Sequence, residues 1–241
     1  MTVLALDTAA TVCSIALVSD KGNWYTEIDA GLRHSELLLE AADALMKLKF
    51  APRLQEVAAV ACMKGPGSFT GLRIGFSAAK GLCLALAVPL LSFSTLDCAA
   101  LPFRHWPGAV MPIIDAKKRR YFTALYQGGA RRTEYLDKSA EDLALLAAEE
   151  LRGGTERILL TGPDAAALYA ALTGLLEPRL AAALHVDPNG KSGGAKALAA
   201  LAKQSLSERG IQAIENEVFS GPLYLRKSDA VPPSPQPPAV L

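Results

Sequence analysis

Few residues in this chain are of the types that build disulfides or metal centres. The 241 residues include four cysteines and three histidines. No two cysteines form a C-x-x-C pair, which favours buried free thiols in a reducing compartment. No two histidines form an H-x-x-x-H pair, so we expect no metal site. The cysteines are Cys13, Cys62, Cys83 and Cys98, and the histidines are His34, His105 and His185.

Strong charge and long apolar runs are also missing. The net charge is +1, so bulk electrostatics gives no reason to expect nucleic-acid binding by this chain alone. The longest apolar run, Leu82 to Leu91, is too short to span a membrane and contains Pro89. The first residues carry no basic leader, so we expect no signal peptide. The hydrophobic fraction of 51% predicts a globular cytoplasmic protein of one large or two small domains.

The most informative segment contains several glycines between Gly65 and Gly81. It follows an apolar run that predicts a buried strand, and it opens a stretch that predicts a helix. Glycine inside a helix costs about 1 kcal/mol relative to alanine, so a close contact must compensate. Small residues recur every four positions and form one ridge that another backbone can approach. This ridge predicts either tight packing within the chain or a subunit interface.

The glycine spacing matches neither common nucleotide motif. No G-x-x-x-x-G-K-[ST] can be found here, and the dinucleotide pattern G-x-G-x-x-G is also broken. The turn before the helix could still cradle an anion with its backbone N–H groups. We favour packing, because the glycines continue deep into the helix, where no ligand would need them.

The order of predicted elements repeats, which indicates a duplicated fold. Each half starts with a strand that ends in an aspartate, Asp7 or Asp115, followed by a hairpin. We therefore expect an α/β protein with two actin-like (ASKHA, ribonuclease H-like) βββαβα units forming two lobes, the second reduced. The first unit comprises strands at 3–7, 12–18, 23–28 and 57–63 with helices at 34–49 and 72–88. The second comprises strands at 109–115, 121–126, 132–136 and 157–161 with a helix ending near residue 151.

These elements suggest three regions. Residues 1–104 form the first lobe with its dimerisation helices, and residues 105–212 form the smaller second lobe, including a helix at 194–208. Residues 213–241 form a C-terminal segment with a disordered proline-rich tail. Capping boxes are predicted where serine is followed by aspartate three residues later. The pairs are Ser94 with Asp97 and Ser139 with Asp142.

The helix at 34–49 has more apolar surface than one sheet would bury. Its apolar positions span an arc of about 220°, whereas a helix lying on a sheet needs roughly 100°. The glycine-rich helix shows the same excess, so we predict that both helices bury against another chain, in a homodimer when the protein is alone. The predicted interface residues are Leu39, Ala42, Met46, Gly67, Gly71, Gly75 and Ala79.

Four motifs resemble the TsaB family, also called YeaZ. They are LALDTAA at 4–10, GPGSFTGLRIGFSAAKGL at 65–82, PIIDAKKRRYF at 112–122 and PLYLR at 222–226. The resemblance implies an actin-like fold and a non-catalytic scaffold role in making N6-threonylcarbamoyladenosine at position 37 of tRNA. It also implies a catalytic partner of the TsaD type, with a TsaE-type ATPase in the assembled complex and tRNA bound only through that complex. The H-x-x-x-H metal motif of TsaD has no counterpart after the glycine helix, so we expect no catalytic residues, no metal and no cofactor.

Two further sets of residues are candidates for binding. Asp7 and Thr8 would lie near the phosphates in a nucleotide-binding actin-like protein, but we place a hairpin-bonding role for Asp7 first. The basic hairpin at Lys117, Lys118, Arg119 and Arg120 is either a solvated turn or a contact for tRNA or an acidic partner. A stand-alone actin-like ATPase or kinase remains the alternative function.

Overall fold

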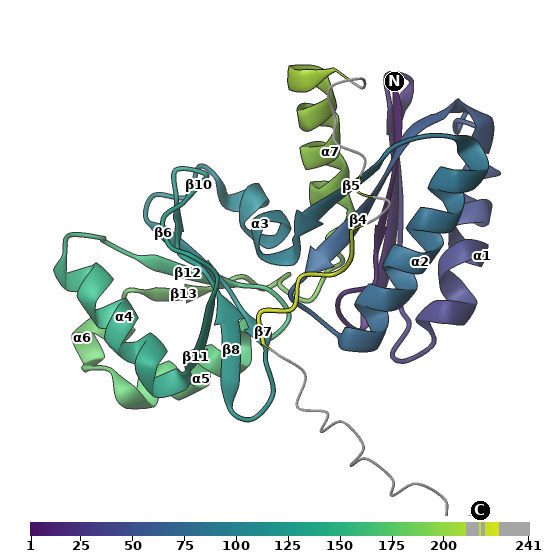
Figure 1. The fold of residues 1–241 in the computed structure, drawn as a ribbon. Coiled ribbons are helices and arrows are strands. Elements are labelled where there is room, and N and C mark those ends of the chain that lie inside the picture. Colours follow the sequence, from purple (N-terminus) through teal and green to yellow (C-terminus); the bar gives the residue numbers. More distant parts are fainter. Residues whose placement is uncertain (211–216, 218–219, 227–241) are drawn as a thin grey trace, which may run out of the picture.

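The computed structural model describes residues 1–210, 217 and 220–226. Figure 1 shows two lobes, each built around a sheet, with the second lobe formed by the middle of the chain. This arrangement confirms the predicted duplicated α/β fold, in which the second unit is the smaller. The predicted proline-rich tail lies outside the described residues.

The first lobe has a five-stranded sheet in the order β3-β2-β1-β4-β5. β1, β2 and β3 are antiparallel, whereas β4 and β5 run parallel to β1. β1 is buried along its whole length, because helices cover both faces of the sheet. The strands are β1 (Thr2–Asp7), β2 (Val12–Ser19), β3 (Gly22–Asp29), β4 (Val57–Gly65) and β5 (Leu90–Ser94).

Two helices lie on one face of this sheet, and a third lies on the other (Figure 1). α1 (His34–Met46) and α2 (Phe69–Leu86) pack on one core, and α7 (Ala195–Arg209) packs on the second. The predicted helix at 194–208 therefore exists, but it joins the first lobe and not residues 105–212. Its alanine-rich face packs on β1, β2 and β4, which present small residues such as Ala5 and Ala61. We propose that residues 1–104 and α7 form one folding unit.

The second lobe contains a five-stranded sheet in the order β10-β9-β6-β12-β13 and a small sheet in the order β11-β8-β7. The predicted strand at 109–115 is divided into β6 and β7, and the predicted strand at 132–136 is replaced by β10 and β11. The strands are β6 (Ala109–Pro112), β7 (Ile114–Asp115), β8 (Arg120–Thr123), β9 (Tyr126–Gln127), β10 (Ala130–Arg131), β11 (Leu136–Ser139), β12 (Ile158–Thr161) and β13 (Leu184–Val186). The helices are α4 (Ala140–Arg152), α5 (Ala165–Leu175) and α6 (Pro178–Ala181).

One predicted capping box is confirmed and the other is wrong. Ser139 and Asp142 exchange hydrogen bonds at the start of α4. Ser94 does accept a hydrogen bond from Leu96 N at the start of α3 (Thr95–Ala100). Asp97, however, accepts hydrogen bonds from two tyrosine hydroxyls of the second lobe, those of Tyr126 and Tyr135, at 2.5 and 2.8 Å. A contact between the lobes therefore replaces the predicted local cap.

Candidate functional site

The glycine ridge of α2 faces the interior of its own chain. A Cβ atom added at Gly71 would lie 2.0 Å from the carbonyl oxygen of Thr8, and one at Gly75 would lie 2.5 Å from the Thr8 hydroxyl. At Gly67 it would lie 2.6 Å from the carbonyl oxygen of Ala9. The Thr8 hydroxyl donates to the carbonyl of Gly71 at 2.7 Å, so the missing side chains allow a direct contact between helix and turn.

Most of the residues predicted at a subunit interface make contacts within their own chain, which is the alternative of tight internal packing. Gly67, Gly71 and Gly75 contact the turn after β1, while Ala79 and Ala42 are buried in the core between α1, α2 and the sheet. Met46 is partly buried against the same core. Leu39 is the exception, with 52% of its surface exposed. A ridge of small residues indicates a close contact but does not identify its partner.

The outward face of α2 is exposed and nearly uncharged. Its exposed residues from Thr70 to Ala85 include a single charged side chain, Arg73. Leu84 is 72% exposed. Only a partner molecule could cover this large apolar side chain. The sequence pattern predicted excess apolar surface on this helix but placed the interface at the glycine ridge, whereas the exposed residues at positions 77, 81 and 84 have the spacing of one helix face.

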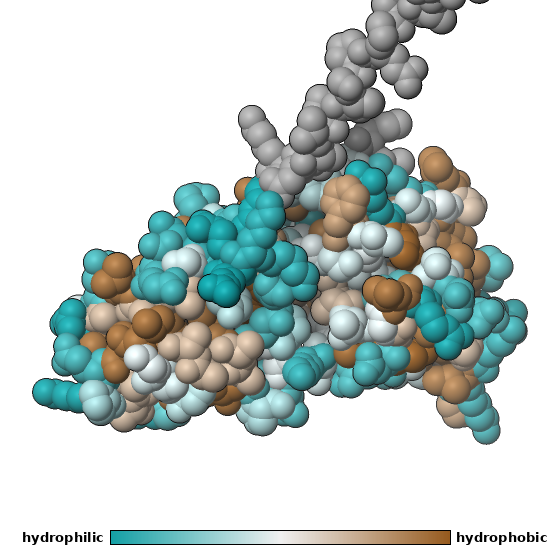
Figure 2. Space-filling model, turned by 90° about the horizontal axis from the view of Figure 1, so that it is seen from below, coloured by the Kyte–Doolittle hydropathy of each residue, from teal (hydrophilic) through white to brown (hydrophobic). Residues whose placement is uncertain are grey.

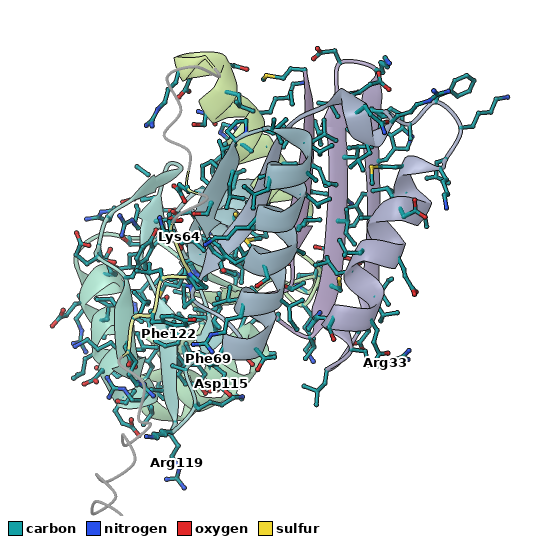
Figure 3. The ribbon with its side chains drawn as sticks, turned by 45° about the vertical axis from the view of Figure 1, so that its right-hand side comes forward. Arg33, Lys64, Phe69, Asp115, Arg119 and Phe122 are labelled. Carbon is teal, nitrogen blue, oxygen red and sulfur yellow. The ribbon has the colours of Figure 1, made fainter. Side chains whose placement is uncertain are left out.

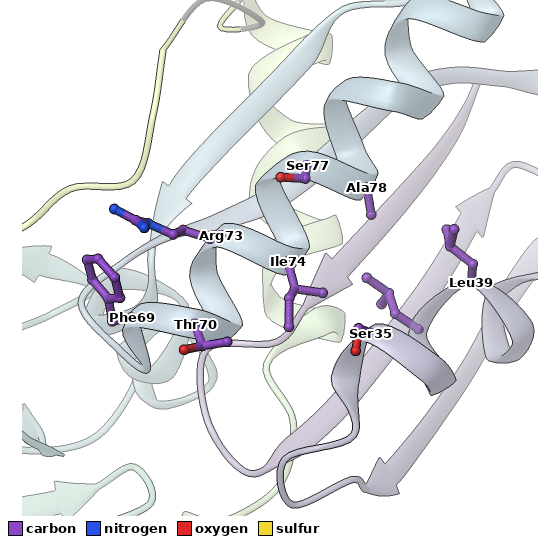
Figure 4. A pocket seen from close by; sticks show the side chains of 9 residues that line it. Ser35, Leu39, Phe69, Thr70, Arg73, Ile74, Ser77 and Ala78 are labelled. Carbon is purple, nitrogen blue, oxygen red and sulfur yellow. The ribbon is translucent and has the colours of Figure 1, made fainter.

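An open groove of about 520 Å³ lies between α1 and α2. Figure 4 shows Leu39, Ile74 and Ala78 facing this space, while Phe69 and Arg73 point to the side of α2 away from α1. The groove is lined by Ser35, Leu38, Leu39, Phe69, Thr70, Arg73, Ile74, Ser77 and Ala78.

The carboxylate of Asp7 is buried and both of its oxygens are occupied. Oδ1 accepts from Ala9 N at 2.9 Å, and Oδ2 accepts from Gly194 N at 2.7 Å and from the Ser14 hydroxyl at 3.5 Å. Burial raises the pKa of Asp7, and these hydrogen bonds only partly oppose that shift. The predicted role of Asp7 in bonding its own hairpin is confirmed, and the bond to Gly194 was not foreseen.

Side chains from the first lobe also occupy the N-terminus of α7. The N–H groups of Gly193, Gly194 and Ala195 donate to Glu27, Asp7 and Ser14 at 3.0, 2.7 and 3.1 Å. Helix N-termini of this kind are common anion sites, because several N–H groups converge there. Here the anions are carboxylates of the chain itself, and a phosphate would meet their negative charge.

The basic hairpin lies between β7 and β8 and has an unusual backbone. Lys117, Lys118 and Arg119 adopt φ angles of 60°, 55° and 58°, a left-handed conformation that costs of order 1 kcal/mol per residue. Asp115 stabilises the turn by accepting from the Lys117 backbone N–H at 2.7 Å and from its ammonium group at 2.8 Å. Burial alone would raise the pKa of Asp115, but these bonds to Lys117 lower it.

Arg120, the last residue of the basic hairpin, binds an aspartate of its own chain. It donates to the carboxylate of Asp137 at 2.8 Å, and it also donates to the backbone carbonyl of Asp137. Arg226 binds the same carboxylate through contacts of 2.7 and 2.9 Å. The two strand-end aspartates, Asp7 and Asp115, belong to separate hydrogen-bond networks.

Neither a metal site nor a clear membrane segment emerges from the described residues. In the part of the chain that the structure describes, no group of three or more His, Cys, Asp or Glu side chains could hold a metal ion. Within the same residues, α2 is the one helix long and apolar enough to span a membrane, judged by length and composition alone. Core helices pass this test as well, and α2 packs Leu72 and Phe76 into the protein interior.

Comparison with known proteins identifies the family. The family model described as TsaD, tRNA N6-adenosine threonylcarbamoyltransferase, matches residues 28–231. The chain is similar to the tRNA threonylcarbamoyladenosine biosynthesis protein TsaB of Bacillus subtilis, with 35% identity over 53% of this chain and 56% of the relative. TsaB of Escherichia coli is also 35% identical, over 53% of this chain and 55% of the relative. The chain thus spans about half the length of the curated relatives it matches.

A solved structure covers more of the chain. The Pseudomonas aeruginosa protein with similarity to peptidase YEAZ superposes with a TM-score of 0.73 and 27% identity. It covers 93% of this chain, and this chain covers 99% of it. The matched sequence, the duplicated fold and this superposition agree with one another. The chain therefore belongs to the family of tRNA N6-adenosine threonylcarbamoyltransferase proteins and, within it, to the TsaB (YeaZ) group.

Proposed function

We propose that this chain is a non-catalytic subunit in the biosynthesis of threonylcarbamoyladenosine in tRNA. It acts in the cytoplasm by binding a catalytic homologue of the TsaD type through the outward face of α1 and α2. The observation that supports this proposal most directly is the exposed and nearly uncharged face of α2, which includes Leu84. Burying a leucine side chain contributes about 1.5–3 kcal/mol, so a partner that covers this face would gain substantially.

The shape of the face also suits a related subunit. α1 and α2 lie side by side with a groove between them, and Leu39 is exposed along its edge. A homologue with a similar helix pair would present ridges that fit such a groove, as in ordinary helix packing. The same face would join two copies when the protein is alone. A TsaE-type ATPase would join the assembled complex, and tRNA would bind to that complex.

The hydrogen bonds at Asp7 and at the N-terminus of α7 support the non-catalytic part of the proposal. In this chain the carboxylate of Asp7 serves as a cap for α7, and the N–H groups that could hold a phosphate already bind Glu27, Asp7 and Ser14. A nucleotide would have to displace buried hydrogen bonds and overcome repulsion from two carboxylates. This arrangement disfavours the alternative of a stand-alone ATPase or kinase.

The proposal is tested with one matched pair of substitutions. Leu84 and Leu145 are both exposed leucines on helices, at 72% and 66%, but Leu145 lies on α4 of the second lobe. We expect Leu84→Arg to weaken binding to the catalytic homologue by about 2 kcal/mol, close to thirtyfold in Kd, while Leu145→Arg has no effect. Light-scattering chromatography of each variant mixed with the homologue measures the complex directly.

A cellular measurement completes this test. Cells that depend on the variant chain should lose threonylcarbamoyladenosine from bulk tRNA with Leu84→Arg and keep it with Leu145→Arg, as read by nucleoside mass spectrometry. Full modification in the Leu84→Arg cells, together with an intact complex, would contradict the proposed interface.

A further inference from the structure

A short C-terminal segment joins the two lobes. We call residues 220–226 the strap; in Figure 1 it is the yellow trace that runs from beside β4 towards β7. Leu223 N donates to the carbonyl of Lys64 in β4 at 2.7 Å. Farther along, Arg226 donates to the carbonyl of Ala116 at 3.0 Å and binds Asp137 of β11. The strap is therefore fixed to the first lobe at one end and to the second lobe at the other.

Positively charged side chains from both lobes lie along the strap. On the first lobe, Lys80 donates to the carbonyl of Ser220 at 2.5 Å, and Arg73 donates to the hydroxyl of Tyr224 at 3.2 Å. Both acceptors are neutral oxygens, so these two bonds do not compensate the positive charges of Lys80 and Arg73. On the second lobe, the basic hairpin begins directly after Ala116, the residue that binds Arg226.

The surface views agree with this distribution. Figure 3 shows Lys64 and Phe69 on the side of the molecule that also presents Asp115 and Arg119, with Arg119 at the outer tip. In Figure 2, hydrophilic residues gather on the lower face beside the point where the grey atoms begin. The surface along the strap thus carries Arg73 and Lys80 on the first lobe and Arg119 on the second, while Lys64 and Lys117 are paired with Glu217 and Asp115.

Exposed aromatic rings accompany these cations. Phe69 and Tyr224 are 49% and 45% exposed, and their ring centroids lie 5.3 Å apart. The guanidinium of Arg73 lies over the Phe69 ring at 3.8 Å. Rings and guanidinium planes of this kind stack on unpaired nucleobases, while the cations beside them bind phosphates.

We propose that the strap and the residues beside it form a binding site for unpaired RNA. The stack of Phe69, Arg73 and Tyr224 receives a base, and the basic hairpin, with Arg119 at its tip, binds the adjoining phosphates. The strained left-handed backbone of the hairpin supports this assignment, because such strain is retained where it positions functional side chains. The choice of RNA over another polyanion rests on the proposed function in tRNA modification.

This site adjoins the groove assigned to the catalytic homologue, because Phe69 and Arg73 also line that groove. In Figure 4 these two side chains point to the side of α2 away from α1, whereas Leu39 and Ala78 face the groove. Tyr224 and Arg119 are not among the residues that line the groove. The substitutions Tyr224→Ala and Arg119→Gln therefore test the RNA site without altering the groove.

The test is a fluorescence anisotropy titration of the full chain with a labelled RNA stem-loop that has an unpaired loop, repeated over a range of salt concentrations. A fully paired RNA duplex serves as the comparison ligand. We expect Tyr224→Ala to weaken binding of the stem-loop about five- to hundredfold and Tyr224→Phe, which keeps the ring, to bind like the unaltered chain. We expect Arg119→Gln to reduce the slope of log K against log salt by about 0.7.

The matched control is Arg179→Gln, which removes the same charge from an exposed residue of α6. It should change neither the affinity nor the salt slope. Circular dichroism establishes that Tyr224→Ala is folded, and Arg119→Gln gives an independent reading, because Arg119 lies at the exposed tip of a turn.

Three results would overturn the RNA site. One is equal binding by Tyr224→Ala, Arg119→Gln and Arg179→Gln; another is no preference for the stem-loop over the duplex. The third is equally strong competition by polyglutamate, which would indicate an acidic protein as the ligand. If one of these results is obtained and Leu84→Arg cells still lose threonylcarbamoyladenosine, the RNA site is wrong but the proposed function is retained. Full modification in those cells would instead contradict the proposed function itself.

Discussion

Asp7 at the end of β1 accepts a hydrogen bond from the backbone N–H of Gly194, 187 positions later in the chain. This bond joins the first strand to the helix that closes the same lobe. In this chain, the aspartate that would face phosphates in a nucleotide-binding relative of the fold instead caps a helix. Asp7 is thereby part of the framework of the first lobe.

The burial of the Asp7 carboxylate predicts how the stability of the protein depends on pH. Because burial raises the pKa of Asp7 above its ordinary value of 3.8, ionised Asp7 is less favourable in the folded than in the unfolded chain. The contribution of Asp7 to stability is therefore largest below pH 3.8 and falls as the pH rises through the raised pKa. We expect the destabilisation caused by Asp7→Asn to be smaller at pH 8 than near pH 4, measured by urea unfolding. A difference that grows with pH would contradict this description.

The glycine ridge predicts opposite effects for two similar substitutions in α2. Gly71→Ala should lower the free energy of unfolding by about 3 kcal/mol, because the new Cβ would lie 2.0 Å from the carbonyl oxygen of Thr8. Gly81→Ala should raise it by about 0.5–1 kcal/mol, because nothing lies within 4 Å of its Cβ position and alanine favours the helix. Both values come from urea unfolding at a low protein concentration. Equal effects of the two substitutions would show that Gly71 is not at a close contact.

The ion pair at the end of the strap predicts loss of stability in acid. Burial of Asp137 would raise its pKa, but bonds to Arg120 and Arg226 outweigh burial and lower it below 3.8. The resulting stability is fully present above pH 3.8 and is lost as the pH falls through the lowered pKa. We expect Asp137→Asn to cost about 2 kcal/mol at pH 7 and much less near pH 3. Lys138→Gln, a substitution of its exposed neighbour, is the control and should be neutral at both values.

The four cysteines predict slow reaction with thiol reagents. All four side chains are buried, and burial raises the pKa values of Cys13 and Cys83 to about 11. Since the thiolate is the reactive form, Ellman's reagent at pH 8 should label the folded chain slowly and all four thiols at once in denaturant. Rapid labelling of one thiol in the folded chain would indicate an opening that the structure does not contain.

Local sequence patterns predicted much of the first lobe. β1, β2 and β3 follow from alternating and apolar runs bounded by turns. α2 follows from the apolar stretch at 72–88, although the helix itself spans Phe69–Leu86. The partner of the glycine ridge was not predictable, because spacing shows that a backbone comes close but not which one. Thr8 supplies that backbone through folding of the chain, 63 positions away.

Contacts between distant segments account for the other differences. Arg73 and Tyr224 are 151 positions apart, and their hydrogen bond depends on how the strap crosses the lobes. The basic hairpin was identified in the sequence, but its neighbouring aromatic stack could not be, because the rings come from α2 and the strap. Asp97 was assigned to a local cap for the same reason, since Tyr126 and Tyr135 meet it only in the folded protein.

The position of α7 has a consequence for synthesis on the ribosome. The face of the first sheet that presents Val3, Ala5 and Met63 is covered by a helix that is translated only after the whole second lobe. A nascent chain that has reached residue 190 therefore exposes one apolar face of a largely formed sheet, which is a target for chaperones and for aggregation. The first lobe is completed only by α7, so premature termination before residue 195 would leave one face of its sheet uncovered.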